Sequence, residues 1–420
     1  MILQDATSRQ LQEAAAYNHS ELFRLEAATL GGTILSSGGL TWTQVGSVAG
    51  SMIPFPDLTD DSAGEHLDRL IASYLQSPPK GAGVWSLDPP QPSDLGVRLL
   101  ARGFQPGWRP CWMALDLFRM PPDYSAPKGL TITLDNRSSL RDVSNLPYAS
   151  VIIPSLPGDQ AGCWARFVAR SRGKVLAHSV VFLTTGEKGA AGIYHVGVVP
   201  KARGKGIGKA VTAAACQYAR EKGYRYAVLN ATGEGRRIYE QMGFTHLGDG
   251  RTWWLITERF LARPPQPLRV LLAEAVGRGD VTALDNLRDR GHAGDLDQPL
   301  TNGMTLMQLA VYCQQPATAG WLADRGVLFS PLDAWDLGWK DRAERLLRDH
   351  PEQVDRQYSD LQLTLLHVAA ERGDTDLARL ALSVRPNLFL QDSIHHGTAL
   401  DWARYFKRES IVHLIESWSR

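Results

Sequence analysis

The hydrophobic and polar positions near the middle of the chain change from a strand pattern to a helix pattern within a few residues. From Gly192 to Val199, small and branched residues alternate as in a buried strand. From Ala210 to Tyr218, most residues are helix formers and none is Gly or Pro. Three glycines, Gly204, Gly206 and Gly208, lie between the two segments. The pattern predicts a strand, a tight loop and a helix in succession.

The glycine loop has the features of a diphosphate-binding site. Glycine lets backbone N–H groups turn toward an anion, and the start of a helix adds the positive end of its dipole. The spacing fits neither the Walker loop nor the dinucleotide motif G-x-G-x-x-G with an acidic residue about 20 positions later. Glycines in a turn can also serve only to relieve backbone strain, and the loop alone does not decide between these interpretations. The candidate binding residues are Val198, Val199, Arg203, Gly204, Lys205, Gly206, Ile207, Gly208 and Lys209.

Two later segments continue the pattern. Residues Tyr224 to Leu229 predict the next strand, and residues Arg236 to Phe244 predict a helix that ends in Gly-Phe. The loop itself, Arg203-x-x-Gly206-x-Gly208 after a strand, resembles motif A of the GNAT acetyltransferases, whose loop holds the pyrophosphate of acetyl-CoA.

The predicted helix before Gly-Phe is similar to the closing helix of the same family, with Tyr239 four residues before the Gly. Together the two motifs imply an α/β fold for residues 130–260, namely the α+β GNAT fold with a mixed sheet and helices. They also imply acetyl-CoA as the cosubstrate and no metal. In this family the substrate amine attacks the thioester directly. The reaction therefore needs a deprotonated amine, a polarised carbonyl and a proton for the leaving thiolate.

The resemblance gives Tyr239 and His195 candidate catalytic roles. Tyr239 matches the family's position beside the CoA sulfur, where it can donate a proton to the thiolate; the alternative is a buried Tyr whose hydroxyl bonds a backbone carbonyl. His195 lies two residues before Gly197, so strand alternation places both on one face with Val199. A neutral His can accept a proton from an ammonium group, but similar sequences often carry Asn at this position. His195 is thus either the general base or a group that only orients substrate or water.

Two proline-rich stretches, residues 119–129 and 262–267, divide the chain into three segments. The first segment is residues 1–120, and its end, Pro92 to Leu117, repeats the pattern of helix, Gly-Phe and strand without the Tyr or the glycine loop. It resembles the degenerate first half of tandem GNAT proteins, which binds no CoA and helps to wall the substrate cleft of the active half. An unrelated cap domain is the alternative.

The third segment, residues 268–420, contains repeats. Residues Thr364 to Asp374 nearly match the ankyrin signature T-P-L-H-x-A-A-x-x-G, with Leu in place of Pro. A similar start at Thr398 lies 34 residues later, close to the ankyrin period of about 33. A degenerate unit around residues 332–347 brings the number of units to four or five. The resemblance implies an all-α ankyrin-repeat solenoid in which His367 is structural.

Composition narrows the class of protein. The formal net charge of +1 gives no reason to expect nucleic acid or a membrane surface as a partner. The four cysteines form no C-x-x-C pair, which argues against a zinc site or a disulfide framework. A polar N-terminus and the lack of any run of 18 apolar residues predict a cytoplasmic protein.

The main hypothesis is an acetyl-CoA-dependent N-acetyltransferase that acts on a primary amine of a small molecule or peptide. Its ankyrin repeats would serve protein interaction or self-association. Two alternatives stay open. One is a protein acetyltransferase whose repeats recruit the substrate, and the other is a non-catalytic CoA-binding scaffold.

Overall fold

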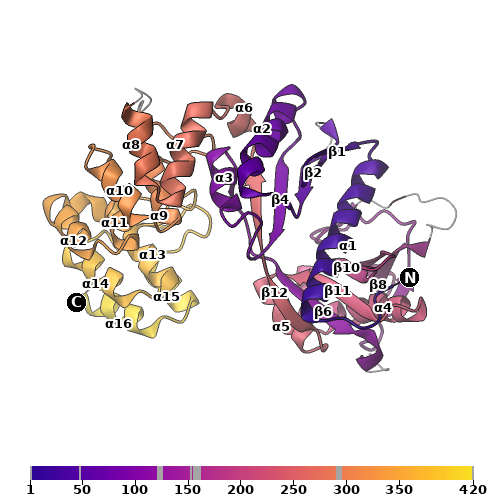
Figure 1. Cartoon of the computed structure of the whole chain (residues 1–420). Coiled ribbons are helices and arrows are strands. Elements are labelled where there is room, and N and C mark those ends of the chain that lie inside the picture. The colour runs from indigo at the N-terminus through magenta and orange to yellow at the C-terminus, as the bar shows by residue number, and fades with distance from the viewer. Residues whose placement is uncertain are drawn as a thin grey trace. The chain divides into compact units, whose positions relative to one another are not determined.

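The computed structural model describes residues 2–46, 49–120, 126–151, 154, 162–289 and 296–418. The chain divides into two compact units, Met1–Pro265 and Gln266–Arg420 (Figure 1). The boundary falls within the second proline-rich stretch. Among the helices of the described ranges, none is long and apolar enough to cross a membrane.

The first unit is built on one mixed sheet of ten strands in its described part (Figure 1). The strand order is β3-β4-β12-β6-β11-β10-β9-β8-β7, and β5 pairs with β12 beside this path. A separate hairpin consists of β1 (Thr33–Ser37) and β2 (Leu40–Gln44). The sheet strands are β3 (Ser51–Pro54), β4 (Ala82–Leu87), β5 (Gln105–Pro106), β6 (Cys111–Asp116), β7 (Thr131–Leu134), β8 (Trp164–Ser171), β9 (Lys174–Leu183), β10 (Ala191–Val198), β11 (Tyr226–Ala231) and β12 (Thr245–Leu255).

The two segments predicted as separate domains, residues 1–120 and 130–260, exchange strands within this sheet. Strand β6 from the first segment pairs with β11 and β12 of the second, while β12 also pairs with β4 of the first. Each segment therefore completes the backbone hydrogen bonding of the other. The two segments share one sheet and lie in a single compact unit.

Helices cover both faces of the sheet. Helix α1 (Ser8–Thr29) begins at a capping box of Thr7 and Gln10 and has no counterpart among the predicted elements. It packs with Trp112 and Val228, whereas α4 (Ile207–Glu221) packs with their strand neighbours Met113 and Leu229. Because successive strand residues point to opposite faces, α1 and α4 lie on opposite sides of the sheet. The remaining helices of this unit are α2 (Asp60–Gln76), α3 (Leu95–Ala101), α5 (Gly233–Glu240) and α6 (Thr257–Ala262).

The second unit is a stack of helix pairs, five in its described part. Contacts of α7 with α9, α9 with α11, α13 with α15 and α14 with α16 join neighbouring pairs. Capping boxes begin the first helix of four pairs, at Thr305, Ser330, Thr364 and Thr398. The helical character of this segment is confirmed. The helices are α7 (Pro267–Arg278), α8 (Val281–Asp289), α9 (Leu306–Tyr312), α10 (Pro316–Ala323), α11 (Pro331–Asp336), α12 (Lys340–Asp349), α13 (Leu365–Arg372), α14 (Thr375–Ser383), α15 (Ala399–Tyr405) and α16 (Glu409–Trp418).

Candidate active site

Strands β10 and β11 separate soon after they begin to pair. Their parallel register covers only Ala191 with Ala227 and Gly192 with Val228, although the strands continue to Val198 and Ala231. A bulge against β9 falls at the same place in β10, between Tyr194 and Gly197. Within the described ranges, the backbone of β10 beyond Gly192 therefore has no strand partner on its β11 side, so its donors and acceptors are available to an extended ligand.

The glycine loop follows directly and opens α4. Gly204 and Gly206 have φ values of +74° and +75°, a left-handed conformation that favours glycine. Gly206 is the N-cap of α4, and no side chain caps that end. Ala210 has the first N–H of the helix that bonds a carbonyl, that of Gly206 at 3.1 Å. The preceding N–H groups are thus free to bind an anion at the positive end of the helix dipole.

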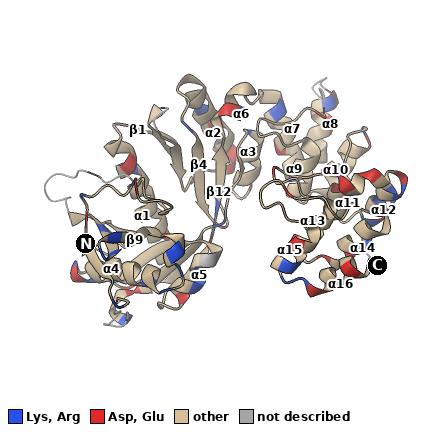
Figure 2. Cartoon of the chain, turned by 180° about the vertical axis from the view of Figure 1, so that it is seen from behind, with Lys and Arg blue, Asp and Glu red and all other residues tan. Residues whose placement is uncertain are grey.

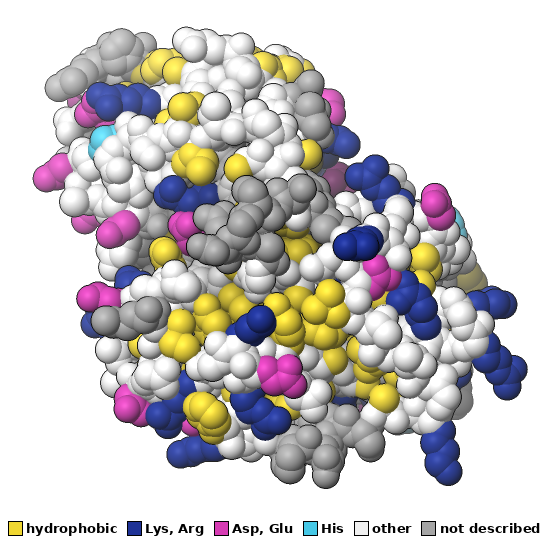
Figure 3. All heavy atoms as spheres, turned by 90° about the vertical axis from the view of Figure 1, so that its right-hand side faces the viewer, with side chains coloured by type: hydrophobic (Ala, Val, Ile, Leu, Met, Phe, Trp, Pro, Cys, Tyr) yellow, Lys and Arg dark blue, Asp and Glu magenta, His cyan; other side chains and the backbone are white. Residues whose placement is uncertain are grey.

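The loop is basic as well as open. Arg203 and Lys205 are exposed, and no carboxylate in the described part of the chain forms an ion pair with either. Lys209 donates to Gln241, which links the start of α4 to the end of α5. Lys and Arg colour parts of both helices in Figure 2. On the side of this unit where α4 is labelled in Figure 1, Lys and Arg side chains border a band of hydrophobic ones (Figure 3). The basic loop suits an anionic ligand.

Tyr239 lies on α5, which is capped by Thr232 through a 3.1 Å bond to the Gly235 N–H. Its ring packs edge-on against Phe244, with centroids 5.7 Å apart. The hydroxyl makes no hydrogen bond to any residue in the described ranges, so no backbone carbonyl holds it there. Burial, with smaller effects from Tyr148 and Cys216, raises the pKa of Tyr239 well above its ordinary value. The hydroxyl is therefore protonated and free to donate.

His195 lies in the bulge of β10 with φ of +50°, a strained conformation for a residue other than glycine. Consecutive strand residues normally point to opposite faces, but the bulge directs both Tyr194 and His195 toward α1. The Tyr194 hydroxyl donates to Asn18 Oδ1 at 2.8 Å, and His195 Nε2 lies 3.5 Å from Glu26 Oε1. Glu26 was not predicted as a site residue, because nothing in the sequence indicates that α1 reaches this strand.

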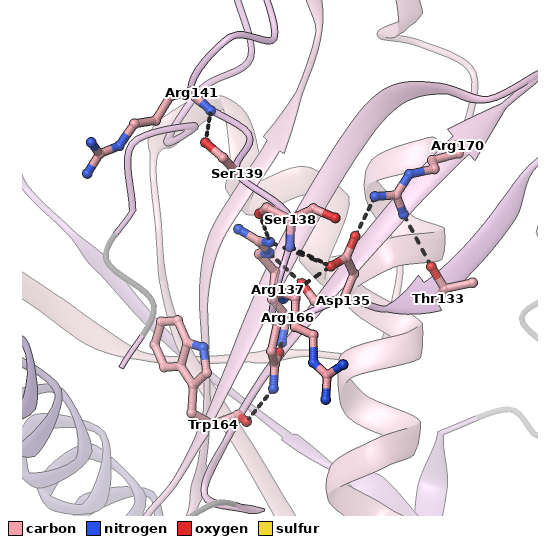
Figure 4. A network of polar contacts seen from close by, with 10 residues as sticks. Thr133, Asp135, Arg137, Ser138, Ser139, Arg141, Trp164, Arg166 and Arg170 are labelled. Carbon is pink, nitrogen blue, oxygen red and sulfur yellow. Dashed lines mark hydrogen bonds and ion pairs between the residues drawn. The ribbon is translucent and has the colours of Figure 1, made fainter. Parts of the chain in front are cut away.

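The segment from Asp135 to Val151 brings Tyr148 to the same place. Its start is held by Arg166 of β8, which is 1% exposed and donates to the carbonyls of Asp135 (2.8 Å) and Ser138 (Figure 4). Although burial opposes ionisation, hydrogen bonds from Ser138 and Arg170 hold the pKa of Asp135 well below its ordinary value. The segment therefore starts from a fixed, charged anchor.

The end of the same segment is fixed against the bulge. His178 Nε2 lies 2.8 Å from the Pro147 carbonyl, to which it donates. A Cβ on Gly197 would come within 2.4 Å of that carbonyl, so only glycine allows this approach. The Tyr148 ring then lies 5.5 Å from the His195 ring. Glu26, His195 and Tyr148 therefore lie in succession, and Tyr148 contributes a smaller part of the raised pKa of Tyr239.

One cluster of metal-ligating groups lies apart from these residues. Ligand atoms of Cys111, His246 and Asp249 lie within 4.8 Å of one another. The Arg236 cation acts on Cys111 and would oppose a bound metal ion. His246 Nε2 already lies 3.0 Å from Asp249 Oδ1. We assign this cluster no role in the site.

Solved structures similar to this chain include several acetyltransferases. A GCN5-related N-acetyltransferase from Kribbella flavida is 17% identical, covers 57% of this chain and 95% of its own, and has a TM-score of 0.45. One from Sphaerobacter thermophilus is 18% identical over 53% of this chain and 75% of its own, with a TM-score of 0.39. A tandem GNAT protein from the clavulanic acid biosynthesis pathway is 13% identical over 53% and 80%, with a TM-score of 0.36. These scores carry no argument about function.

Sequence comparison gives a more specific result. No curated protein matches the chain significantly. Residues 137–244, about a quarter of the chain, match the family model described as "Acetyltransferase (GNAT) family". The matched range runs from the anchored segment at Asp135 through the glycine loop to Phe244. The match supports a GNAT acetyltransferase domain over these residues.

Proposed function

We propose that the chain is an acetyl-CoA-dependent N-acetyltransferase that moves an acetyl group to a primary amine by direct attack. The observation that carries this proposal is the separation of β10 from β11 beside the uncapped start of α4. The diphosphate of acetyl-CoA would bind the free N–H groups from Gly204 to Lys209, with Arg203 and Lys205 adding positive charge. The pantetheine arm would lie along the unpaired edge of β10, where Val198 and Val199 line the way to the loop.

The reacting end of the cosubstrate would then lie between Tyr239 and the bulge. Backbone groups from Gly197 to Val199 would polarise the thioester carbonyl as it gains negative charge. Tyr239 would give its proton to the departing thiolate. A tyrosine hydroxyl is protonated at neutral pH, so this proton is available when the thiolate forms.

The test is release of CoA thiol from acetyl-CoA in the presence of separate panels of small primary amines, peptides and proteins. Release with small amines or peptides, together with the acetylated product by mass spectrometry, supports the proposal. Release with proteins alone would favour a protein acetyltransferase. Binding of acetyl-CoA without transfer to any panel would favour a scaffold and would contradict the proposed activity.

We further propose that residues 268–420 are ankyrin repeats that serve protein interaction or assembly. The contacts of His367 support this proposal. Its Nδ1 lies 2.7 Å from the Thr364 hydroxyl, and its Nε2 lies 3.1 Å from the carbonyl of Gly397 in the next helix pair. Such bonds fasten one repeat to its neighbour, which agrees with a structural role for His367.

A further inference from the structure

The first segment of the chain contributes a carboxylate to the acceptor side of the site. We propose that Glu26 and His195 together bind the ammonium form of the acceptor amine and remove its proton. This inference rests on the proposed acetyl transfer and names the acceptor class as a cationic primary amine. It gives residues 1–120 a direct part in the reaction, in addition to completing the sheet.

Glu26 has the surroundings of a cation-binding group. Its carboxylate is 23% exposed, and in the described ranges no Lys or Arg forms an ion pair with it. The nearby Arg24 on the same helix pairs with Glu21 instead. A half-buried carboxylate without a cation is poorly compensated. An ammonium ion would provide the missing positive charge.

His195 is positioned to share that ammonium ion. Its Nε2 is buried and has no hydrogen-bond partner, although it lies 3.5 Å from Glu26 Oε1. The ammonium group would contact the exposed part of the Glu26 carboxylate, and its proton would pass from there to Nε2. The left-handed backbone of His195 supports this role, because strained residues persist only where the surrounding structure fixes them and they concentrate at functional sites.

Apart from Glu26, the ionisable groups near His195 are either neutral or paired with an opposite charge. His19 on α1 and His178 on β9 face His195, and burial lowers their pKa values to about 3 and about 4, so both are neutral at pH 7. Burial, with a smaller effect from the Glu26 charge, raises the pKa of Tyr194 well above its ordinary value. Arg166 pairs with Asp135, and Arg24 pairs with Glu21. The net local field therefore favours a cation.

An aromatic wall completes the site. The centroid of the Tyr148 ring lies 5.5 Å from that of the His195 ring. An aromatic face beside a carboxylate is a common arrangement for binding ammonium groups. Tyr148 is 54% exposed, so a substrate can reach its ring.

Helix α1 is held firmly enough to position Glu26. Asn18 donates from one Nδ2 to the carbonyls of Phe182 (3.1 Å) and Ala190 (2.9 Å), and accepts from Tyr194. Asn18 and Glu26 are eight residues apart, with the buried Leu22 between them, so they lie along one face of the helix.

Each proton in the proposed reaction has a donor and an acceptor. The ammonium group gives one proton to His195, with Glu26 stabilising the imidazolium. The free amine nitrogen then forms a bond to the thioester carbon, and the carbon–sulfur bond breaks. Tyr239 protonates the thiolate and recovers a proton from the new amide nitrogen through solvent. One proton is released overall when His195 returns to the neutral form.

The test compares two nucleophiles in the full-length protein. The first is n-butylamine, which is almost entirely cationic at pH 7 since alkylammonium pKa values are about 10. The second is hydroxylamine, which is mostly neutral at that pH. Glu26→Gln should lower kcat/KM for n-butylamine by about 10-fold to 100-fold, as for loss of a hydrogen bond to a charged group. Hydroxylamine should be affected much less. Glu21→Gln, on the same helix, is the matched control and should affect neither.

His195→Asn tests the proton transfer. It should lower the n-butylamine rate at pH 7 by about 100-fold, and the loss should shrink as the pH rises toward the pKa of the amine. Equal losses with both nucleophiles, or no loss with n-butylamine, would overturn the inference. The acetyl-CoA thermal shift checks that each variant folds, and Glu26→Asp, which keeps the carboxylate, should recover part of the activity.

If the parent protein acetylates neither nucleophile, the ammonium site is tested by binding, while the proposed function is tested by the wider panels. In that case n-butylammonium should still raise the Tm of the parent but not that of Glu26→Gln. A shift of equal size in both proteins would refute the ammonium site.

Discussion

The first unit contains the same turn twice, once in each of its exchanged segments. Gly103 follows the end of α3 with φ of +94°, and Gly243 follows the end of α5 with φ of +93°. The next residue bonds back in both cases: Phe104 N–H to the Leu99 carbonyl at 3.1 Å, and Phe244 N–H to the Tyr239 carbonyl at 3.0 Å. Leu99 thus occupies the position of Tyr239. It is fully buried and has no group that could transfer a proton.

The strand pair and the helix that precede each turn also differ between the two segments. The parallel pair β3 and β4 stays in register through all four residues from Ser51 to Pro54, whereas β10 and β11 part after two. Helix α2 begins after Thr59 with Asp60 and Asp61 in its first turn, and α4 begins after a glycine loop with no acidic residue there. An anion would be repelled at the first and attracted at the second. A shared backbone frame is therefore not enough for the proposed site, which also needs the loop, the strand opening and one hydroxyl.

The largest effect is expected from removing the loop that only the second segment has. Acetyl-CoA at about 100 times its Kd should stabilise the parent by about 2.7 kcal/mol. Gly206→Glu should abolish that stabilisation, because it places bulk and negative charge where the diphosphate binds. Thermal unfolding with and without acetyl-CoA measures the effect.

Gly173→Glu is the matched control for backbone strain. Gly173 has the same φ of +75° and lies in the turn between β8 and β9 with open space around it. It should lower the stability of the apo protein while leaving the acetyl-CoA shift intact. Loss of the shift in both variants, or in neither, would contradict the assignment of the loop.

A comparably large effect is expected at Tyr239, where the second segment differs from Leu99 of the first. Tyr239→Phe should lower kcat by about 100-fold to 10,000-fold with little change in acetyl-CoA binding, because the hydroxyl acts when the thiolate leaves. Tyr218→Phe removes another hydroxyl from the same core, one that donates to the Gly162 carbonyl at 3.2 Å, and should leave kcat near the parent value. An unchanged kcat in Tyr239→Phe, with chemistry rate-limiting, would make Tyr239 a packing residue.

The strands and helices of residues 130–260 could be predicted because each depends on a pattern of neighbouring residues. The alternation from Gly192 and the helix formers after Gly208 correspond to β10 and α4. The strand exchange was not predictable in this way: β6 has the same apolar pattern whichever segment it joins, and only long-range pairing places it between β11 and β12. The bulge at His195 and the approach of Glu26 also depend on contacts between residues far apart in the sequence. Glu26 was therefore not among the candidate residues predicted from the sequence.

A smaller effect, on the pH dependence of stability, is expected at the buried contact between the two segments. His19 packs among Phe23, Trp85 and Tyr194, which come from both segments. Burial, with a smaller effect from His195, lowers the pKa of His19 from 6.5 to about 3. The unfolded chain therefore binds a proton that the folded chain does not, so stability is lost as the pH falls below about 6.5, by up to about 1.4 kcal/mol per pH unit.

His19→Phe should remove this contribution. Between pH 7 and pH 5, the free energy of unfolding should fall by about 2 kcal/mol less in the variant than in the parent. Denaturant unfolding at the two pH values measures the difference. Equal losses in both proteins would mean that His19 does not carry the acid sensitivity of the junction.

The smallest effect is expected from removing the second unit, because every group assigned to acetyl-CoA lies in the first. Deletion after Pro265 cuts at the boundary of the two compact units and leaves the sheet, α1 and the glycine loop complete. The shortened protein should keep the acetyl-CoA shift and the rate with n-butylamine, while its oligomeric state, its partners or its preference among protein acceptors changes. Calorimetric binding and the thiol-release assay measure the first two. A shortened protein that folds but does not bind acetyl-CoA would show that the helix pairs complete the site, and the contrast between the two segments would then be only part of what makes it.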